Sequence, residues 1–279
     1  MPKELKFSII TPSLNQGRFM CEALSSVQQQ AYPHLEHIVV DGGSQDGTVN
    51  LLQSISSGPK FAHVHWSSER DHGQSEAVNK GFRQATGDVI GWLNSDDRYR
   101  PGCLEQVAQA FASHPSLDVL YGDTAWMDES GQVFRRRREI EFSYFILLYH
   151  RVLYIPTTAT FFRHRIIESN FLDETLNYAM DYEFFLRLAR AGYRFKHLPA
   201  TLADFRWQRD SKSMTAAKRQ REEQDRVARK HSPSFQTLPG KILRECAFAS
   251  LRQVAGARRY AEKLLRGYYI DYLRSTVSG

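Results

Sequence analysis

The stretch GDVIGWLNSDDRYRPG at residues 87–102 sets two adjacent carboxylates, Asp96 and Asp97, directly after a short apolar run. The run at residues 89–93 has the composition of a buried strand. Two like charges this close both stay ionised only where water, hydrogen-bond donors or a cation takes up the charge. The polar segment therefore has two interpretations. It is either a solvated turn, since Asn, Ser and Asp favour turns, or a site for Mg²⁺ or Mn²⁺ shared with a phosphate-bearing ligand.

Short apolar runs and helical patterns alternate through the first half of the chain. This alternation is typical of an α/β fold with a mainly parallel sheet flanked by helices. Beyond residue 121 the sequence predicts a hairpin at 123–138, further strands at 157–162 and 193–198, and a helix at 181–191. The predicted strands of the first half are residues 7–11, 35–40, 61–66, 89–93 and 117–121, separated by helices at 19–29, 49–55, 75–85 and 103–113.

The composition is that of a globular protein, because 42% of the 279 residues are hydrophobic and the formal net charge is +6. A basic balance suits phosphate-bearing ligands or an anionic membrane face, whereas no pattern of basic and aromatic residues indicates nucleic-acid binding. No apolar stretch approaches the roughly 20 residues of a membrane-spanning helix, and the three cysteines are too scattered to suggest a disulfide framework. We expect a cytoplasmic protein, with peripheral contact at the inner face of the membrane as an alternative.

Polar or acidic side chains follow four successive predicted strands. Ligands of parallel sheets bind outside the carboxyl ends of the strands, which meet at one edge. Each segment alone is compatible with a turn or a helix cap, but four in succession at one edge favour a binding site. The residues in question are Thr11 and Asn15, Asp41, Asp71, and the pair Asp96 and Asp97.

Five segments resemble the inverting family 2 glycosyltransferases with the GT-A fold, and they occur in the order found in that family. They are TPSLNQGRF (11–19), VVDGGSQDGT (39–48), SERDHGQSEAVNKGFRQATGD (68–88), GWLNSDD (91–97) and AMDYEFFLRLARAGYRF (179–195). The resemblance implies a GT-A domain over residues 1–214, with a nucleotide-binding half at 1–123 and an acceptor half at 124–214. It leaves a basic helical C-terminal extension at residues 215–279.

The resemblance also implies roles for individual residues. Asp97 would be the principal ligand of Mn²⁺ or Mg²⁺, and Asp96 would contact the metal or the ribose. Asp181 corresponds to the catalytic base, although an acidic residue at a helix start is also ordinary capping, and Arg206 would contact a phosphate. The walls of the nucleoside pocket would be Thr11, Pro12, Asn15, Asp41 and Asp71.

Residue 208 departs from the family pattern. Many relatives carry a histidine shortly after the arginine that corresponds to Arg206, and this chain has Gln208 there. A neutral amide is a poorer ligand for a divalent metal than imidazole. We therefore expect the metal to be held mainly by Asp97, the donor diphosphate and water.

The resemblance as a whole implies an inverting glycosyltransferase. It would move a sugar from a nucleotide-diphosphate sugar, expected to be a UDP-sugar, to a hydroxyl of a saccharide or lipid-linked glycan in cell-surface polysaccharide biosynthesis. The alternative is a catalytically silent subunit that binds a nucleotide or a glycan within a polysaccharide assembly complex. The C-terminal helices would pack on the core, on a second subunit as a homo-oligomer, or against a membrane. A dinucleotide-binding oxidoreductase is excluded, because G-x-G-x-x-G is missing after the first predicted strand.

Overall fold

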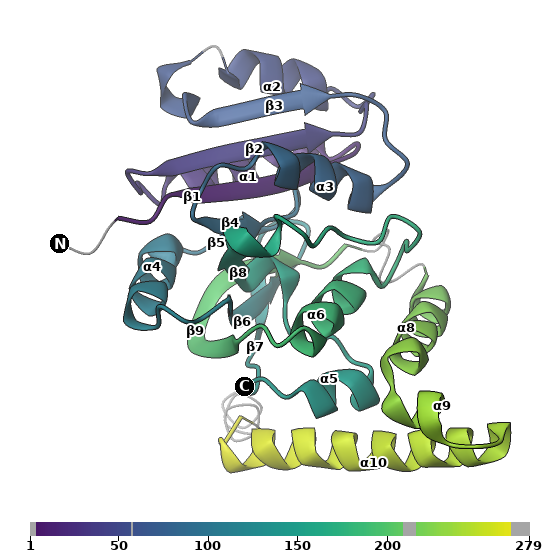
Figure 1. The fold of residues 1–279 in the computed structure, drawn as a ribbon. Coiled ribbons are helices and arrows are strands. Elements are labelled where there is room, and N and C mark those ends of the chain that lie inside the picture. The colour runs from purple at the N-terminus through teal and green to yellow at the C-terminus, as the bar shows by residue number, and fades with distance from the viewer. Residues whose placement is uncertain (1–3, 57, 209–215, 269–279) are drawn as a thin grey trace.

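A curled, mixed sheet runs through the centre of the chain, and helices cover both of its faces (Figure 1). The structure is a computed structural model and describes residues 4–56, 58–208 and 216–268. Four parallel strands in the order β3-β2-β1-β4 form its first half. These strands are β1 (Phe7–Ser13), β2 (Leu35–Asp41), β3 (Val64–Ser68) and β4 (Val89–Trp92).

The second half of the sheet contains strands of both directions. β8 (Thr160–Arg163) lies antiparallel between β4 and β6 (Val119–Met127), and β9 (Phe195–Arg206) runs parallel to β6. The short strand β5 (Arg98–Tyr99) pairs with β9 at the far edge, and β7 (Val133–Arg137) forms a hairpin with β6. Only residues 93–97 separate β4 from β5. The sheet must therefore curl to join its middle strand to its far edge.

Neighbouring side chains of a strand point to opposite faces of the sheet, and each face has its own helices. Ile38 and Val40 of β2 pack in one cluster with α3 and α6, whereas Val39 packs in another with α1 and α2. α4 packs on the buried side chains of β1 and β4. These helices are α1 (Gly17–Gln28), α2 (Thr48–Ser56), α3 (Gln74–Gln84), α4 (Cys103–Ser113) and α6 (Met180–Arg190).

Further helices lie at the end of the molecule away from β3 (Figure 1). α8 (Ala217–His231) packs against α6, and α10 (Lys241–Leu265) packs against α5 (Tyr144–His150). The short helix α9 (Pro233–Thr237) connects α8 to α10. The C-terminal region is thus mainly helical, as predicted, and residues 269–279 lie outside the described part of the chain. Within the described residues, no helix combines the length and the apolar composition that crossing a bilayer requires.

The predicted alternation of strands and helices is confirmed, with local differences. The strand predicted at 61–66 begins later, because Pro59–Phe61 forms a 3₁₀ turn. The strand predicted at 157–162 likewise begins with a 3₁₀ turn, η2 (Thr157–Ala159). The sequence did not predict β5, since two residues carry no periodic pattern. β9 continues to Arg206, beyond its predicted end, because its later part pairs with both β6 and β5.

Gly91 lies where three side chains close on β4. A Cβ added there would lie 2.6 Å from the Tyr99 hydroxyl, 2.8 Å from Ile9 and 2.9 Å from Phe161. We expect Gly91→Ala to lower the free energy of unfolding by about 1–3 kcal/mol, the usual cost of overpacking a core. Chemical denaturation of the two proteins measures this difference.

Gly58→Ala is the matched control for this substitution. The nearest heavy atom to its added carbon is 3.6 Å away, and the φ angle of Gly58 is −103°. Gly58→Ala should change the free energy of unfolding by less than about 1 kcal/mol. Equal effects of the two substitutions would contradict the packing described for β4.

Candidate active site

Asp96 and Asp97 lie in a tight turn that leaves the carboxyl end of β4. Asp97 is 1% exposed, and its carboxylate accepts hydrogen bonds from the Arg206 backbone N–H at 2.8 Å, from Asn94 Nδ2 at 3.2 Å and from the Thr158 hydroxyl. Burial, and then the neighbouring Asp96, raise the pKa of Asp97 well above its usual range. A carboxylate in this position is ionised at neutral pH most readily with a cation beside it.

The acidic pair fits a hard divalent cation. Burial also raises the pKa of Asp96, so the charge of both carboxylates is poorly compensated when they ionise. Mg²⁺ and Mn²⁺ prefer oxygen ligands, and Mg²⁺ commonly combines one or two carboxylates with phosphate and water. Within the described residues, no group of three His, Cys, Asp or Glu side chains is placed to hold a metal. The chain could supply two carboxylates, and a bound diphosphate would complete the ligand set.

Gln208 contacts the acidic pair directly. Its Nε2 donates to Asp96 Oδ2 at 2.5 Å, and its Oε1 accepts a hydrogen bond from Arg18 Nη2 at 2.8 Å. The residue that departs from the family pattern is therefore placed beside the predicted metal ligands. Since its N–H group faces the carboxylate, Gln208 acts here as a hydrogen-bond donor to Asp96.

Arg206, the last residue of β9, is buried, and its side chain contacts the acidic turn. Its Nε donates to the Asp96 carbonyl at 2.8 Å, its Nη1 donates to the carbonyls of Asp128 and Glu129, and its Nη2 pairs with Glu22. The guanidinium is thus occupied by protein oxygens, and the predicted phosphate contact would require this network to open. In the structure, Arg206 fixes the position of the acidic turn.

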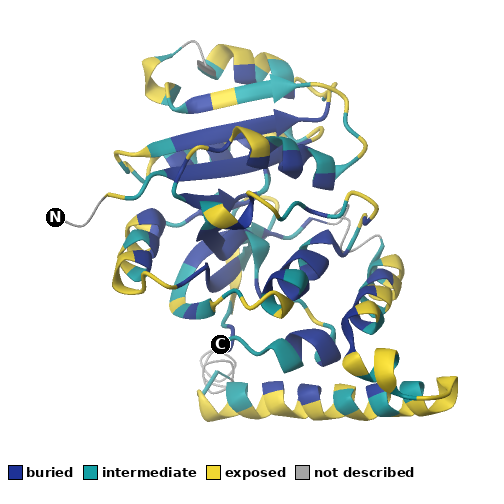
Figure 2. Cartoon of the chain, in the orientation of Figure 1, coloured by how far each residue is buried: buried dark blue, intermediate teal, exposed yellow. Residues whose placement is uncertain are grey.

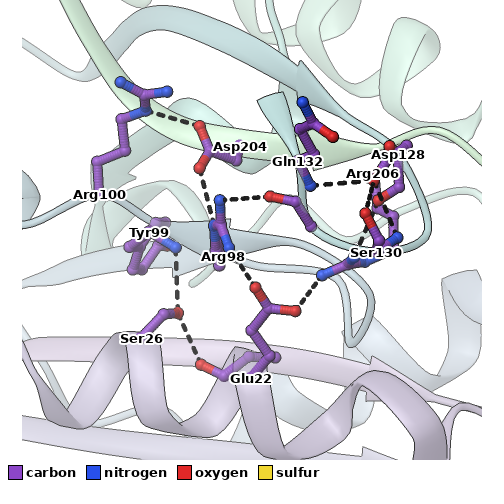
Figure 3. A network of polar contacts seen from close by, with 12 residues as sticks. Glu22, Ser26, Arg98, Tyr99, Arg100, Asp128, Ser130, Gln132, Asp204 and Arg206 are labelled. Carbon is purple, nitrogen blue, oxygen red and sulfur yellow. Dashed lines mark hydrogen bonds and ion pairs between the residues drawn. The ribbon is translucent and has the colours of Figure 1, made fainter. Parts of the chain in front are cut away.

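Glu22 joins Arg206 to Arg98, the residue that directly follows the acidic pair (Figure 3). Arg98 also donates to Asp204 at 2.8 Å, and Arg100 pairs with the other oxygen of Asp204 at 2.6 Å. Guanidinium groups and carboxylates alternate through this network, so each partly buried charge has an opposite partner. The segment that carries the acidic pair is therefore anchored to α1 through Glu22 and to β9 through Asp204.

Three of the predicted nucleoside-pocket residues meet at the carboxyl ends of β1, β2 and β3. Asp41 is buried and accepts hydrogen bonds from the Ser44 N–H at 2.9 Å and from the Ser68 hydroxyl at 2.7 Å. Asn15 Oδ1 accepts a hydrogen bond from the Gln45 N–H at 2.9 Å. These bonds hold the loops after neighbouring strands against each other.

Asp71 reaches the same edge from the loop after β3. A Cβ added to Gly42 would lie 2.6 Å from Asp71 Oδ2, so this close approach depends on the missing side chain of Gly42. Burial raises the pKa of Asp71, and the charges of Glu76 and Asp41 contribute in the same direction. The structure thus brings Asp41 and Asp71 close together, although they are distant in sequence.

Thr11 and Pro12 are buried within β1 itself. The Thr11 hydroxyl lies 2.8 Å from His37 Nε2 on β2, so its side chain joins two strands inside the sheet. At the same edge, the hydroxyl oxygens of Ser13 and Ser67 are buried and have no hydrogen-bond partner among the residues described. Ser13 is the last residue of β1, and Ser67 is the last but one of β3, so both belong to the polar strand ends.

Asp181 stands in the first turn of α6, on the wall of a cavity of about 590 Å³. Its carboxylate accepts hydrogen bonds from the Tyr182 N–H at 2.7 Å and from the Thr157 hydroxyl at 3.3 Å. Burial raises the pKa of Asp181 to about 6. A carboxylate with a pKa in this range is suited to accept a proton near neutral pH.

The cavity beside Asp181 combines aromatic and basic side chains. Trp126 and Trp207 stack with their ring centroids 5.0 Å apart. Large aromatic faces with a few polar groups that fix orientation are typical of small-molecule binding sites. The lining residues include Trp92, Trp126, Trp207, Asn94, Arg137, Arg151, Arg221 and Arg252.

Two adjacent threonines connect the acidic turn to Asp181. In η2, the Thr157 hydroxyl donates to Asp181 Oδ2, and the Thr158 hydroxyl donates to Asp97 Oδ2. Neighbouring residues of one short turn thus hold both carboxylates. This connection could not be predicted from the sequence, because a pair of threonines at the start of a predicted strand forms no motif.

Comparison with known sequences identifies the family. A model of glycosyl transferase family 2 matches residues 8–174. An uncharacterized glycosyltransferase of Mycobacterium tuberculosis is 34% identical over 185 residues, which cover 65% of this chain and 68% of that protein. The putative teichuronic acid biosynthesis glycosyltransferase TuaG of Bacillus subtilis is 36% identical over 99 residues, which cover 36% of this chain and 39% of TuaG.

Solved structures share the fold at lower identity. S. aureus TarS 1–349 in complex with UDP-GlcNAc gives a TM-score of 0.67 at 20% identity, covering 95% of this chain and 75% of that one. Mannosyltransferase PcManGT from Pyrobaculum calidifontis, in complex with GDP-Man and Mn²⁺, gives a TM-score of 0.63 at 16% identity. The match covers 99% of this chain and 80% of the PcManGT chain. The chain spans 42% of a longer TarS chain. The predicted GT-A fold is confirmed, and the chain belongs to glycosyl transferase family 2.

Proposed function

We propose that this protein is an inverting glycosyltransferase that moves a sugar from a nucleotide-diphosphate sugar to a hydroxyl of a saccharide or lipid-linked glycan. The proposal rests on the shared attachment of Asp181 and Asp97 to η2 through neighbouring threonines. Asp181 is suited to accept a proton, and the acidic pair is suited to bind a cation beside a diphosphate. In a single displacement, Asp181 would take the proton of the acceptor hydroxyl, and the cation would offset the negative charge of the leaving diphosphate.

In the proposed reaction, the acceptor hydroxyl attacks the anomeric carbon of the donor while Asp181 takes its proton. The bond from that carbon to the diphosphate oxygen breaks on the opposite side, so the configuration inverts. Mn²⁺ or Mg²⁺ held by Asp96 and Asp97 would supply charge stabilisation for the leaving diphosphate. Asn94 contacts Asp97 and also lines the cavity, which supports placing the donor diphosphate and the acceptor on either side of this residue.

The relatives support the proposed substrate classes. TarS was solved with UDP-GlcNAc and PcManGT with GDP-Man, which supports a nucleotide-sugar donor, and we assign a UDP-sugar. TuaG is named for teichuronic acid biosynthesis, which supports a role in building a cell-surface polysaccharide. The cavity beside Asp181, with its stacked tryptophans, is the proposed acceptor site.

Asp181→Asn should reduce sugar transfer by at least about 100-fold, because an amide cannot take the acceptor proton. Release of UDP from a panel of UDP-sugars, with Mn²⁺ and mixed glycan acceptors, measures this loss. The kcat/KM of the wild type should also fall below about pH 6, where Asp181 becomes protonated. Wild-type turnover by Asp181→Asn would remove Asp181 from the mechanism. A wild type that binds a donor without any turnover would favour the silent binding subunit.

The same substitution should stabilise the unliganded protein at alkaline pH. The pKa of Asp181 rises from 3.8 to about 6 on folding, so the folded state binds the proton more tightly and the wild type loses stability as the pH rises through 6. The loss amounts to up to about 3 kcal/mol, and asparagine avoids it. Asp181→Asn should therefore melt at a higher temperature than the wild type at pH 8 and differ little from it at pH 4. If the difference in melting temperature between Asp181→Asn and the wild type were equal at pH 4 and pH 8, the raised pKa of Asp181 would be contradicted.

The two threonines of η2 provide a matched pair of substitutions. Thr157→Val removes a hydrogen bond that lowers the pKa of Asp181, so the acid limb of the pH-rate profile should move to higher pH. Thr158→Val removes a donor to Asp97 and should raise the Mn²⁺ concentration needed for half-maximal activity, with the acid limb unchanged. Steady-state kinetics over pH and Mn²⁺ concentration separates these effects. Identical profiles for the two variants would contradict the division of roles.

A further inference from the structure

Three of the arginines that line the cavity beside Asp181 come from helices. Arg151 directly follows α5, Arg221 belongs to α8, and Arg252 belongs to α10. We call these three residues the arginine cluster. α5 packs against both α6 and α10, and its residues are buried or of intermediate exposure (Figure 2). Arg221 and Arg252 lie beyond residue 174, where the match to the family model ends, so the C-terminal helices add two cations to the cavity.

The three arginines converge on the end of α5. Arg221 precedes Asp225 by one turn of α8, and Asp225 pairs with Arg151 directly after α5. Arg252 precedes Gly256 by one turn of α10. A Cβ added to Gly256 would lie 3.3 Å from a ring carbon of the last residue of α5, so this face of α10 lies against the same helix end. Neighbouring helices thus bring guanidinium groups distant in sequence to one part of the cavity.

The charge of Arg151 is only partly compensated by the protein. Its side chain is 10% exposed and pairs with Asp225, but its Nε is buried and has no hydrogen-bond partner among the described residues. Burial lowers the pKa of Arg151, and the positive charge of Arg252 acts in the same direction. A buried guanidinium is costly unless opposite charges and hydrogen-bond acceptors surround it. An anion in the cavity would therefore stabilise this part of the structure.

The other two arginines of the cluster carry charge that no protein group offsets. Two acidic residues line the cavity, and one of them, Asp225, is already paired with Arg151. The other, Asp181, is held by the Tyr182 N–H and a threonine hydroxyl. Across residues 4–56, 58–208 and 216–268, no carboxylate forms an ion pair with either the α8 or the α10 member of the cluster.

A fourth arginine of the cavity is not part of this excess charge. Arg137 of β7 pairs with Glu139 at 2.5 Å and donates to the Leu153 carbonyl at 3.1 Å. Its guanidinium also lies 5.9 Å from the ring centroid of Trp126. The cavity therefore has a wall of stacked aromatic rings with a paired cation, and a separate region with unpaired cations.

We propose that the arginine cluster binds an anionic group of the acceptor, a phosphate or a carboxylate, while a sugar ring of the acceptor lies toward the stacked tryptophans. This inference rests on the proposed function, because it concerns the substrate that fills the cavity. Guanidinium groups donate paired hydrogen bonds to the oxygens of phosphates and carboxylates. The acceptor is thus an acidic saccharide, and the cluster selects it over a neutral one.

The donor diphosphate is the other anion that these arginines could contact. Asp96 and Asp97, the proposed metal ligands, are not among the residues that line the cavity, and Asn94 lies between them and it. The acidic pair lies in the turn between β4 and β5, whereas the cluster belongs to α5, α8 and α10. This separation favours the acceptor as the source of the anion.

Binding of small sugars tests the cluster without any turnover. Titration calorimetry with glucose 6-phosphate, glucuronate and glucose, in the absence of nucleotide and Mn²⁺, compares the wild type with Arg221→Gln/Arg252→Gln. At least one anionic sugar should bind the wild type at least about 10-fold more tightly than glucose, and the double variant should lose about 10-fold in affinity for it, since hydrogen bonds between charged groups are the strong ones. Tighter binding of glucose 6-phosphate would assign a phosphate, and tighter binding of glucuronate a carboxylate.

Arg226→Gln/Arg258→Gln is the matched control. Both arginines are exposed, lie on α8 and α10, and do not line the cavity, so this variant has the same net charge as the cluster variant. It should bind the anionic sugar within about two-fold of the wild type, because exposed charges away from the ligand are screened. Equal losses in the two double variants, or no preference of the wild type for an anionic sugar over glucose, would overturn the proposal.

Two further measurements separate this inference from the proposed reaction. Asp181→Asn should bind the anionic sugar at least as tightly as the wild type, because the amide removes a negative charge from the cavity. A wild type that binds the sugar through the cluster but transfers no sugar would contradict the proposed function and support the anion site. UDP with Mn²⁺ should raise the melting temperature of the cluster variant as much as that of the wild type. A smaller rise would assign the arginines to the donor and overturn the proposal.

Discussion

The position of the acidic pair depends on Arg206. Its backbone N–H donates to the Asp97 carboxylate, and its guanidinium donates to the Asp96 carbonyl and pairs with Glu22. Because Arg206 ends β9 while the acidic turn leaves β4, this one residue ties two separate parts of the curled sheet together. A buried guanidinium without partners would be costly, and the carboxylate of Glu22 offsets that cost while also holding Arg98.

The two acidic centres differ in their surroundings, and this difference suits them to different tasks. Asp97 is enclosed by donors from three segments and lies beside Asp96, so a cation is the natural means of compensating its charge. Asp181 lies on the wall of a cavity, and its pKa of about 6 suits proton transfer. The turn η2 contacts both, so the distance between the proposed metal site and the proposed base is set by the backbone of two consecutive residues.

The sequence predicted the elements and the edge of the sheet at which the site lies, because strand alternation and polar strand ends follow from local pattern. Asp41 ends β2, and Asp71 and the acidic pair lie in the loops that follow β3 and β4, at the expected edge of the parallel strands. The burial of Arg206, the contact of Gln208 with Asp96 and the threonine bridge could not be predicted, since they join residues far apart in sequence that share no periodicity. The contact of Thr11 could not be predicted either, because its hydroxyl bonds to His37 of another strand inside the sheet. The role of Asp181 came from the family resemblance, since an acidic residue at a helix start has an ordinary capping explanation.

The most direct test of the account is a thermal-shift panel of UDP, dTDP, GDP and CDP, each with and without Mn²⁺, on the wild type and on Asp97→Asn. A ligand at a hundred times its dissociation constant stabilises the folded state by about 2.7 kcal/mol, which raises the melting temperature of a chain of this size by several degrees. UDP should stabilise the wild type only with Mn²⁺, and Asp97→Asn should lose this response. No shift with any nucleotide, or an equal Mn²⁺-dependent shift in both proteins, would contradict a metal-diphosphate site at the acidic pair.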